Sequence, residues 1–256
     1  MEASRAILGL LSAESTLSAR ALADAGDVLG IAPNAVRVAL SRLKQRGVVR
    51  SPARGVYTMG PSRLRARVER WRDRHQQLAP WAGGWIAVHT AGLGRSDRSE
   101  LAQRSRALRL LGFIEVAAEL HARPDNLVGG RAAVVDELKE LGLSPDTPVL
   151  DLRTLDAELV RVAVDEWNAP ELEAAYAEQT ESLQEAETRI RSLPLGEAAA
   201  LSFALGDAAI RRINRDPLLP EDYVDAHARE RFFLTMLRFD QIGRAHWNRI
   251  LAEVAA

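Results

Sequence analysis

Hydrophobic residues recur at helical spacing in the first third of the chain and predict three short helices. The first is expected over Ser4–Leu11, where apolar residues lie three and four positions apart. The second begins after Ser18, a good helix N-cap, and ends at Gly30, a residue type that suits the left-handed backbone after a helix. The third is expected to run from Asn34, as its cap, to about Arg46.

The third predicted helix has two different faces. At about 100° per residue, three apolar residues lie within about 60° of one another: Val36, Leu40 and Leu43. The opposite side is polar and cationic and carries Asn34, Arg37, Ser41, Lys44 and Gln45. We therefore expect the apolar side to pack on the first two helices and the polar side to face outward.

Two short β-like segments follow Gly47. Residues 48–51 and 55–59 read as strands, and the connection at 52–55 places Arg54 at the tip of a hairpin. The order helix, helix, turn, helix, hairpin predicts an N-terminal winged helix-turn-helix over residues 1–61. An amphipathic linker helix is expected over 62–80, because apolar residues recur there at spacings of three and four: Leu64, Val68, Trp71, His75 and Leu78. This stripe suits either pairing across a dimer or packing back on its own chain.

Residues 81–155 carry a second pattern, in which short strands alternate with helices. Strands are expected at 85–90, 113–117, 119–123 and 148–153, and helices at about 96–112 and 130–143. The order βαββαβ predicts a ferredoxin-like middle domain. That fold carries many functions, so it does not by itself indicate one.

The last part of the chain, 156–256, reads as a helical C-terminal domain for effector binding or dimerisation. Helices are expected from Pro170 to about Arg191, over Glu197–Asn214 and over Asp225–Glu253. The predicted fold class is therefore α+β, mostly helical. Three arginines precede the proline-rich turn before the last helix: Arg211, Arg212 and Arg215. They fit either an anion-binding group or a solvated helix end that is favourable against the helix dipole.

Charge is distributed unevenly along the 256 residues. Residues 1–75 hold fourteen Lys and Arg against six Asp and Glu, a net charge of +8, whereas the whole chain has a net charge of −1. Residues 34–60 contain no acidic residue. A basic N-terminal part on an acidic body is typical of a polyanion-binding domain joined to a regulatory module.

The basic segment suits double-stranded DNA. A recognition helix fits the major groove, where Arg and Lys bind guanine and Asn and Gln bind adenine. Arginines on the hairpin suit phosphates or the adjacent minor groove. The predicted DNA-binding residues are Asn34, Arg37, Ser41, Arg42, Lys44, Gln45, Arg50 and Arg54.

Several classes of site and location are not expected. The chain has no Cys, so it has neither disulfides nor thiolate metal sites, which fits a cytoplasmic protein. No run of eighteen apolar residues is present, so no membrane span is expected. The residues indicate no metal site, cofactor or catalytic group, and the lone Glu115 in the second middle strand does not make a metal-dependent nuclease.

The segment "VRVALSRLKQRGVVRSPARGVYTM" resembles the winged-helix signature of the PaaX-like family, the phenylacetic acid degradation repressors. Further similarity lies in "WAGGWIAV", "LRLLGF", "VDEWNAPELEAAYAEQTESL" and "RDPLLPEDY", so the resemblance covers nearly the whole chain. It implies a homodimeric transcriptional regulator that binds a palindromic DNA operator. It also implies control by a small-molecule effector, in the name-giving case an acyl-CoA thioester, although it assigns no effector-binding residue here.

The sequence therefore predicts a DNA-binding repressor of a catabolic pathway rather than an enzyme. Two alternatives stay open from the sequence. One is a nuclease-like enzyme built on the ferredoxin-like domain, and the other is a winged helix that docks protein in an assembly without regulated DNA binding.

Overall fold

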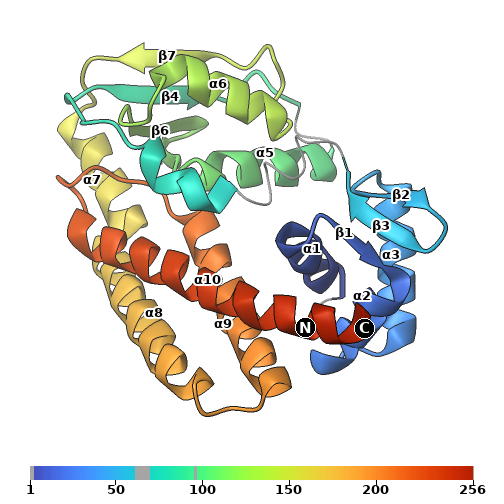
Figure 1. Cartoon of the computed structure of the whole chain (residues 1–256). Helices are drawn as coiled ribbons and strands as arrows, with labels where there is room; N and C mark the ends of the chain where they lie inside the picture. The colour runs from blue at the N-terminus through green and yellow to red at the C-terminus, as the bar shows by residue number, and fades with distance from the viewer. Residues whose placement is uncertain (1–2, 61–69, 95–96, 256) are drawn as a thin grey trace. The chain divides into compact units, whose positions relative to one another are not determined.

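The computed structural model describes residues 3–60, 70–94 and 97–255 (Figure 1). The chain is α+β and mostly helical, with two small antiparallel sheets, as the sequence predicts. Close contacts divide it into two compact units. Unit 1 comprises Met1–Arg72, Thr180–Ile210 and Leu234–Ala256, and unit 2 comprises Asp73–Gln179 and Arg211–Phe233.

Unit 1 begins with three helices, α1 (Ala3–Ala13), α2 (Ala19–Val28) and α3 (Pro33–Gln45). Strands β2 (Val49–Ala53) and β3 (Val56–Met59) follow and form an antiparallel hairpin. These are the predicted elements. A further strand, β1 (Thr16–Ser18), pairs with β3 and was not predicted, because three residues are too few to show an alternating pattern.

The ends of α2 are those that the sequence predicts. The Ser18 side chain accepts a hydrogen bond from the Ala21 backbone N–H at 3.0 Å, and Gly30 takes a left-handed φ of +68° after the helix. The predicted cap of α3 is wrong. This helix begins one residue earlier at Pro33, its N-cap is Ala32, and no side chain caps it. The fixed φ of proline suits a first helical position, so the helix starts there without a side-chain cap.

This difference between the two caps predicts a contrast in stability. Ser18→Ala should lower the free energy of unfolding by about 1 kcal/mol, because a backbone N–H of α2 loses its acceptor. Asn34→Ala should leave the free energy within about 0.5 kcal/mol of wild type, because Asn34 caps nothing. Urea unfolding followed by circular dichroism measures both, and equal losses would contradict the assignment of the caps.

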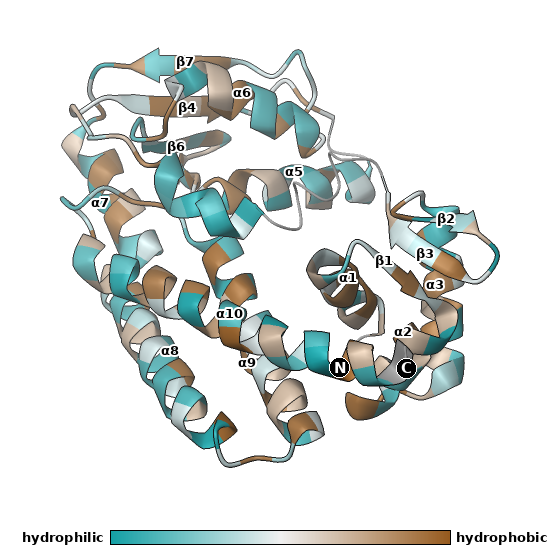
Figure 2. Cartoon of the chain, viewed as in Figure 1, coloured by the Kyte–Doolittle hydropathy of each residue, from teal (hydrophilic) through white to brown (hydrophobic). Residues whose placement is uncertain are grey.

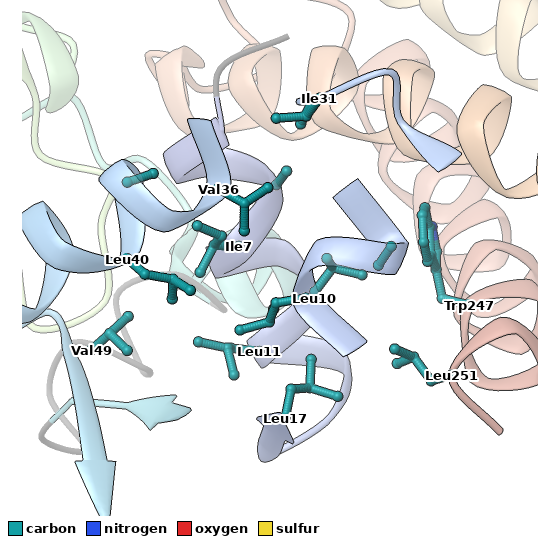
Figure 3. Close-up of a cluster of buried hydrophobic side chains, with 14 of the residues drawn as sticks. Ile7, Leu10, Leu11, Leu17, Ile31, Val36, Leu40, Val49, Trp247 and Leu251 are labelled. Atoms are coloured by element: carbon teal, nitrogen blue, oxygen red, sulfur yellow. The ribbon is translucent and has the colours of Figure 1, made fainter. Parts of the chain in front are cut away.

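The core of unit 1 joins the N-terminal helices to the last helix, α10 (Ala226–Ala255). The predicted inward residues of α3 are buried beside the predominantly apolar α1, and Trp247 and Leu251 of α10 belong to the same cluster (Figures 2 and 3). Gly9 of α1 allows close packing, because a Cβ there would lie 2.8 Å from the ring of Phe203 in α9 (Leu195–Arg215). The first helices therefore depend on distant parts of the sequence for their core.

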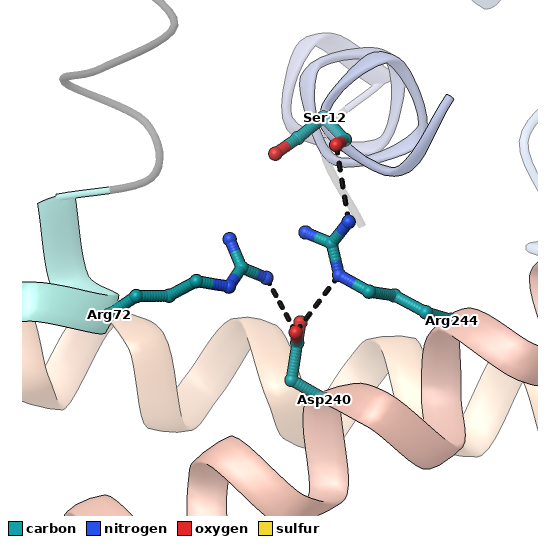
Figure 4. A network of polar contacts seen from close by, with 4 residues as sticks. All are labelled: Ser12, Arg72, Asp240 and Arg244. Carbon is teal, nitrogen blue, oxygen red and sulfur yellow. Dashed lines mark hydrogen bonds and ion pairs between the residues drawn. The ribbon is translucent and has the colours of Figure 1, made fainter. Parts of the chain in front are cut away.

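A polar network adds to this packing within unit 1 (Figure 4). The Asp240 carboxylate accepts hydrogen bonds from Arg72 at 2.5 Å and from Arg244 at 2.9 Å. Arg244 also donates to the backbone carbonyl of Ser12, at the C-terminal end of α1, at 3.2 Å. The network thus ties α10 both to α1 and to the segment that follows residue 69.

Unit 2 contains a four-stranded antiparallel sheet in the order β5-β6-β4-β7. Its strands are β4 (Trp85–His89), β5 (Ile114–Ala117), β6 (Leu120–Pro124) and β7 (Val149–Leu152), each close to its predicted range. Helices α5 (Arg98–Leu110) and α6 (Gly130–Glu140) lie between them in the sequence. One core takes side chains from the sheet and from both helices: Ile86, Val88, Leu108, Val134 and Leu138.

The predicted linker helix falls partly on residues 61–69, which lie outside the described residues, as do Leu64 and Val68. Its described part is a 3₁₀ helix, η1 (Arg70–Gln77), in which Trp71 is buried. The remaining helices are α7 (Ala157–Trp167) and α8 (Ala169–Ile190). Helix α7 was not predicted; α8, α9 and α10 lie within a few residues of their predicted ranges. None of the helices in the described ranges is long and apolar enough to cross a membrane.

Candidate nucleic-acid interface

The outward face of α3 carries the predicted polar and basic side chains. Val36, Leu40 and Leu43 are 3–4% exposed and form part of the unit 1 core. The predicted DNA-binding residues on this helix are all exposed: Asn34, Arg37, Ser41, Arg42, Lys44 and Gln45. The structure therefore brings these six residues together on the surface of one helix whose other side is fixed by packing.

The hairpin that follows presents the other two predicted residues. Arg50 is exposed on β2, and Arg54 is exposed in the turn before Gly55, which takes a φ of +73°. A register shift between Arg50 and Ala53 marks an irregularity in the pairing of β2 with β3. Such irregularities bend a strand and change the direction of its side chains.

Hydrogen bonds hold the hairpin on the segment that joins α1 to α2. The Gly55 carbonyl accepts from the Ala19 N–H at 2.7 Å, beside the N-terminus of α2. The Thr58 hydroxyl donates to the Ser15 carbonyl at 2.7 Å, next to the pairing of β1 with β3. The hairpin and α3 are thus parts of one packed structure, so Arg54 is presented at a fixed place relative to α3.

The basic side chains of this surface keep their charges unpaired. Among the described residues, none of the following six takes part in an ion pair: Arg37, Arg42, Lys44, Arg46, Arg50 and Arg54. Exposed cations without intramolecular partners are free to neutralise phosphates and to release counterions. We name these six side chains, with Asn34, Ser41 and Gln45, the basic face.

Two residues of this surface, Arg46 and Val38, are not among the predicted DNA-binding residues. Val38 is 41% exposed on α3, about 200° around the helix from the buried Val36. An exposed apolar side chain between basic ones suits the methyl group of thymine in the major groove. The signal was present in the sequence, because position 38 falls on the polar side of the predicted helix.

Comparison with known proteins bears on the fold alone. No family model and no curated protein matches the chain. Among solved structures, the chain is similar to an uncharacterized protein, Rv0674 from Mycobacterium tuberculosis. The two are 20% identical, the match covers 100% of this chain and 99% of the other, and the TM-score is 0.65. The whole fold is therefore shared with at least one other protein.

The described ranges offer no candidate for a catalytic metal centre. They contain no group of three or more His, Cys, Asp or Glu side chains able to hold a metal ion. Glu115 accepts a hydrogen bond from the Glu119 backbone N–H at 2.9 Å, which is a local contact within the β5–β6 hairpin. The basic face of α3 and the hairpin has a chemistry that suits a polyanion.

Proposed function

We propose that this protein is a DNA-binding transcriptional regulator that reads duplex DNA with α3 and grips it with the β2–β3 hairpin. The observation that carries the proposal is the basic face: exposed cations on α3 and the hairpin, unpaired among the described residues, with the other side of α3 buried. Basic side chains with Asn and Gln among them suit both phosphates and base edges.

The arrangement of elements supports a winged helix-turn-helix at the N-terminus. Three helices precede a two-stranded hairpin, and β1 completes a small sheet with it. In such domains the last helix before the hairpin enters the major groove. The order β5-β6-β4-β7 in the sheet of unit 2 likewise supports a ferredoxin-like middle domain, because the first and third strands of the βαββαβ unit are neighbours there.

A homodimer on a palindromic operator is part of the proposal. A single recognition helix reads few base pairs, and two-fold pairing doubles the site and sets half-sites about 34 Å apart. The resemblance to PaaX-like regulators adds repression of a catabolic pathway in the cytoplasm. It also adds release from DNA by a small-molecule effector, with an acyl-CoA thioester as the candidate.

Salt dependence tests the DNA-binding proposal directly. We expect fluorescence anisotropy with DNA from upstream of the protein's own gene to give an affinity that falls steeply with salt. Each neutralised phosphate adds about −0.9 to the slope of log K against log salt concentration. Six unpaired cations on the basic face predict a slope of about −5 per chain if all of them contact phosphates.

The test variant reverses charge on the basic face, and the control reverses charge at an exposed position outside it. Arg42→Glu with Lys44→Glu should abolish binding, whereas Arg161→Glu, at an exposed position of α7 in unit 2, should not change it. An affinity that does not depend on salt, or an equal loss in both variants, would overturn the proposal. A protein partner captured by the basic face with no DNA binding would favour the protein-docking alternative.

A further inference from the structure

One guanidinium group in unit 2 has donors without acceptors. Arg212 lies in the last turn of α9, and its Nε and Nη2 atoms are buried with no hydrogen-bond partner in the described structure. These two nitrogens form one edge of the guanidinium, the edge that binds a carboxylate or phosphate with two parallel hydrogen bonds. Buried donors are nearly always hydrogen-bonded, so we expect an acceptor at this edge.

The surroundings of Arg212 hold it in place without supplying that acceptor. Its guanidinium carbon lies 5.9 Å from the centre of the Tyr176 ring. Tyr176 itself donates its hydroxyl to the Asp216 carboxylate at 2.5 Å. The other Asp216 oxygen accepts from the Leu218 backbone N–H at 2.8 Å. The nearby carboxylate is therefore occupied by the tyrosine and by the loop.

Positive charge exceeds negative charge at this place. Arg229 is 5% exposed and donates to the Leu219 carbonyl at 2.5 Å, and among the described residues it makes no ion pair. Burial and the Asp216 carboxylate raise the pKa of Tyr176, while Arg229 and Arg212 lower it. Through its hydrogen bond to Leu219, Arg229 lies beside the loop that Asp216 holds. A water molecule would accept hydrogen bonds from the free donors but would leave the excess positive charge uncompensated. An anion would accept the same hydrogen bonds and compensate the charge.

We infer that the Nε–Nη2 edge of Arg212, backed by Tyr176 and Arg229, is a binding site for the carboxylate or phosphate group of a small molecule. Arg212 as a residue is only partly buried, while its Nε–Nη2 edge is buried. The site assigns a chemical class to the effector of the proposed regulator. That regulatory role rests on the proposed function, whereas the binding itself does not.

The first test measures binding without DNA. Inorganic phosphate and benzoate, titrated by calorimetry at constant ionic strength, represent the two sources of an oxyanion. We expect saturable binding of at least one of them by the wild type. Arg212→Lys keeps the charge but loses the two-pronged edge and should weaken binding at least about tenfold. Arg212→Met should abolish binding, and Arg215→Gln, an exposed neighbour on α9, should leave it unchanged.

Thermal unfolding separates this role from a structural one. A structural Arg212 would make Arg212→Met less stable than wild type in buffer without phosphate. An anion-binding Arg212 predicts a melting temperature that is equal or higher in the variant, because unpaired buried donors are removed. The variant should also lose the increase in melting temperature that the bound anion gives to the wild type.

Three outcomes would overturn the inference: no saturable binding of either anion, equal binding by Arg212→Met, or a lower melting temperature of that variant without anion. A final titration adds DNA. The anion that binds should weaken the DNA complex of the wild type and leave that of Arg212→Met unchanged. Absence of DNA binding by the wild type would count against the proposed function alone, since the first titration contains no DNA.

Discussion

Asp216→Ala should lower the stability of unit 2 by about 3–5 kcal/mol, the loss expected when one partner of a buried charged network is removed. The carboxylate is 2% exposed and accepts hydrogen bonds from Tyr176 and from the Leu218 N–H. Without it, a buried hydroxyl and a buried N–H lose their acceptors, and the neighbouring arginines lose their counter-charge. Urea unfolding followed by tryptophan fluorescence measures the loss, because Trp81, Trp85 and Trp167 are close together in unit 2.

The reason for so large an effect lies in the loop that Asp216 organises. Leu218 takes a φ of +52°, which is costly for a residue with a branched side chain. The Leu218 N–H donates to the Asp216 side chain, and the Leu218 carbonyl accepts from the Asn126 side-chain amide at 2.8 Å. Arg74 donates to the Asp216 carbonyl at 2.7 Å. The strained turn is stable only while these partners hold it.

Two variants act as controls for this prediction. Asp216→Asn keeps an oxygen acceptor but removes the charge, so it should lose less than Asp216→Ala. Asp222→Ala changes an exposed carboxylate of the same loop and should change stability by less than about 0.5 kcal/mol. If Asp216→Ala were as stable as Asp222→Ala, the network would not support the loop.

The N-terminal elements and the sheet of unit 2 were predictable because their signals are local. The two faces of α3 follow from helical spacing, and the ends of α2 follow from Ser18 and Gly30. The cap of α3 was misplaced because Pro33, directly before the predicted cap Asn34, itself suits the first helical position. Helix α7 carried an unrecognised signal, since its N-cap Asp156 accepts from the Glu158 N–H at 3.0 Å.

Contacts between distant segments could not be predicted in this way. Three arginines near the end of α9 looked alike in the sequence, yet Arg215 is exposed and Arg212 has a buried edge. The difference depends on Tyr176, which another helix contributes. The core around α1 likewise needs Trp247 and Leu251 from the far end of the chain. Residue spacing indicates which face of a helix is buried but not what covers it.

Arg37→Ala should cost roughly 1–3 kcal/mol of binding free energy on the cognate operator and much less on random DNA. Arg37 is exposed near the N-terminal end of α3, where recognition helices reach base edges. Arg54→Ala should weaken cognate and random DNA by similar amounts and reduce the salt slope by about one unit, as expected for a phosphate contact. Competition anisotropy with the two DNAs, repeated over a range of salt concentrations, measures both effects.

The structure makes this pair a clean comparison, because neither side chain belongs to the core and neither forms an ion pair within the described residues. Both variants should therefore keep the circular dichroism and melting temperature of the wild type. Equal losses on both DNAs for Arg37→Ala would show that α3 only grips the backbone. Relaxed sequence preference in Arg54→Ala alone would assign base reading to the hairpin, since a phosphate contact carries no direct sequence information.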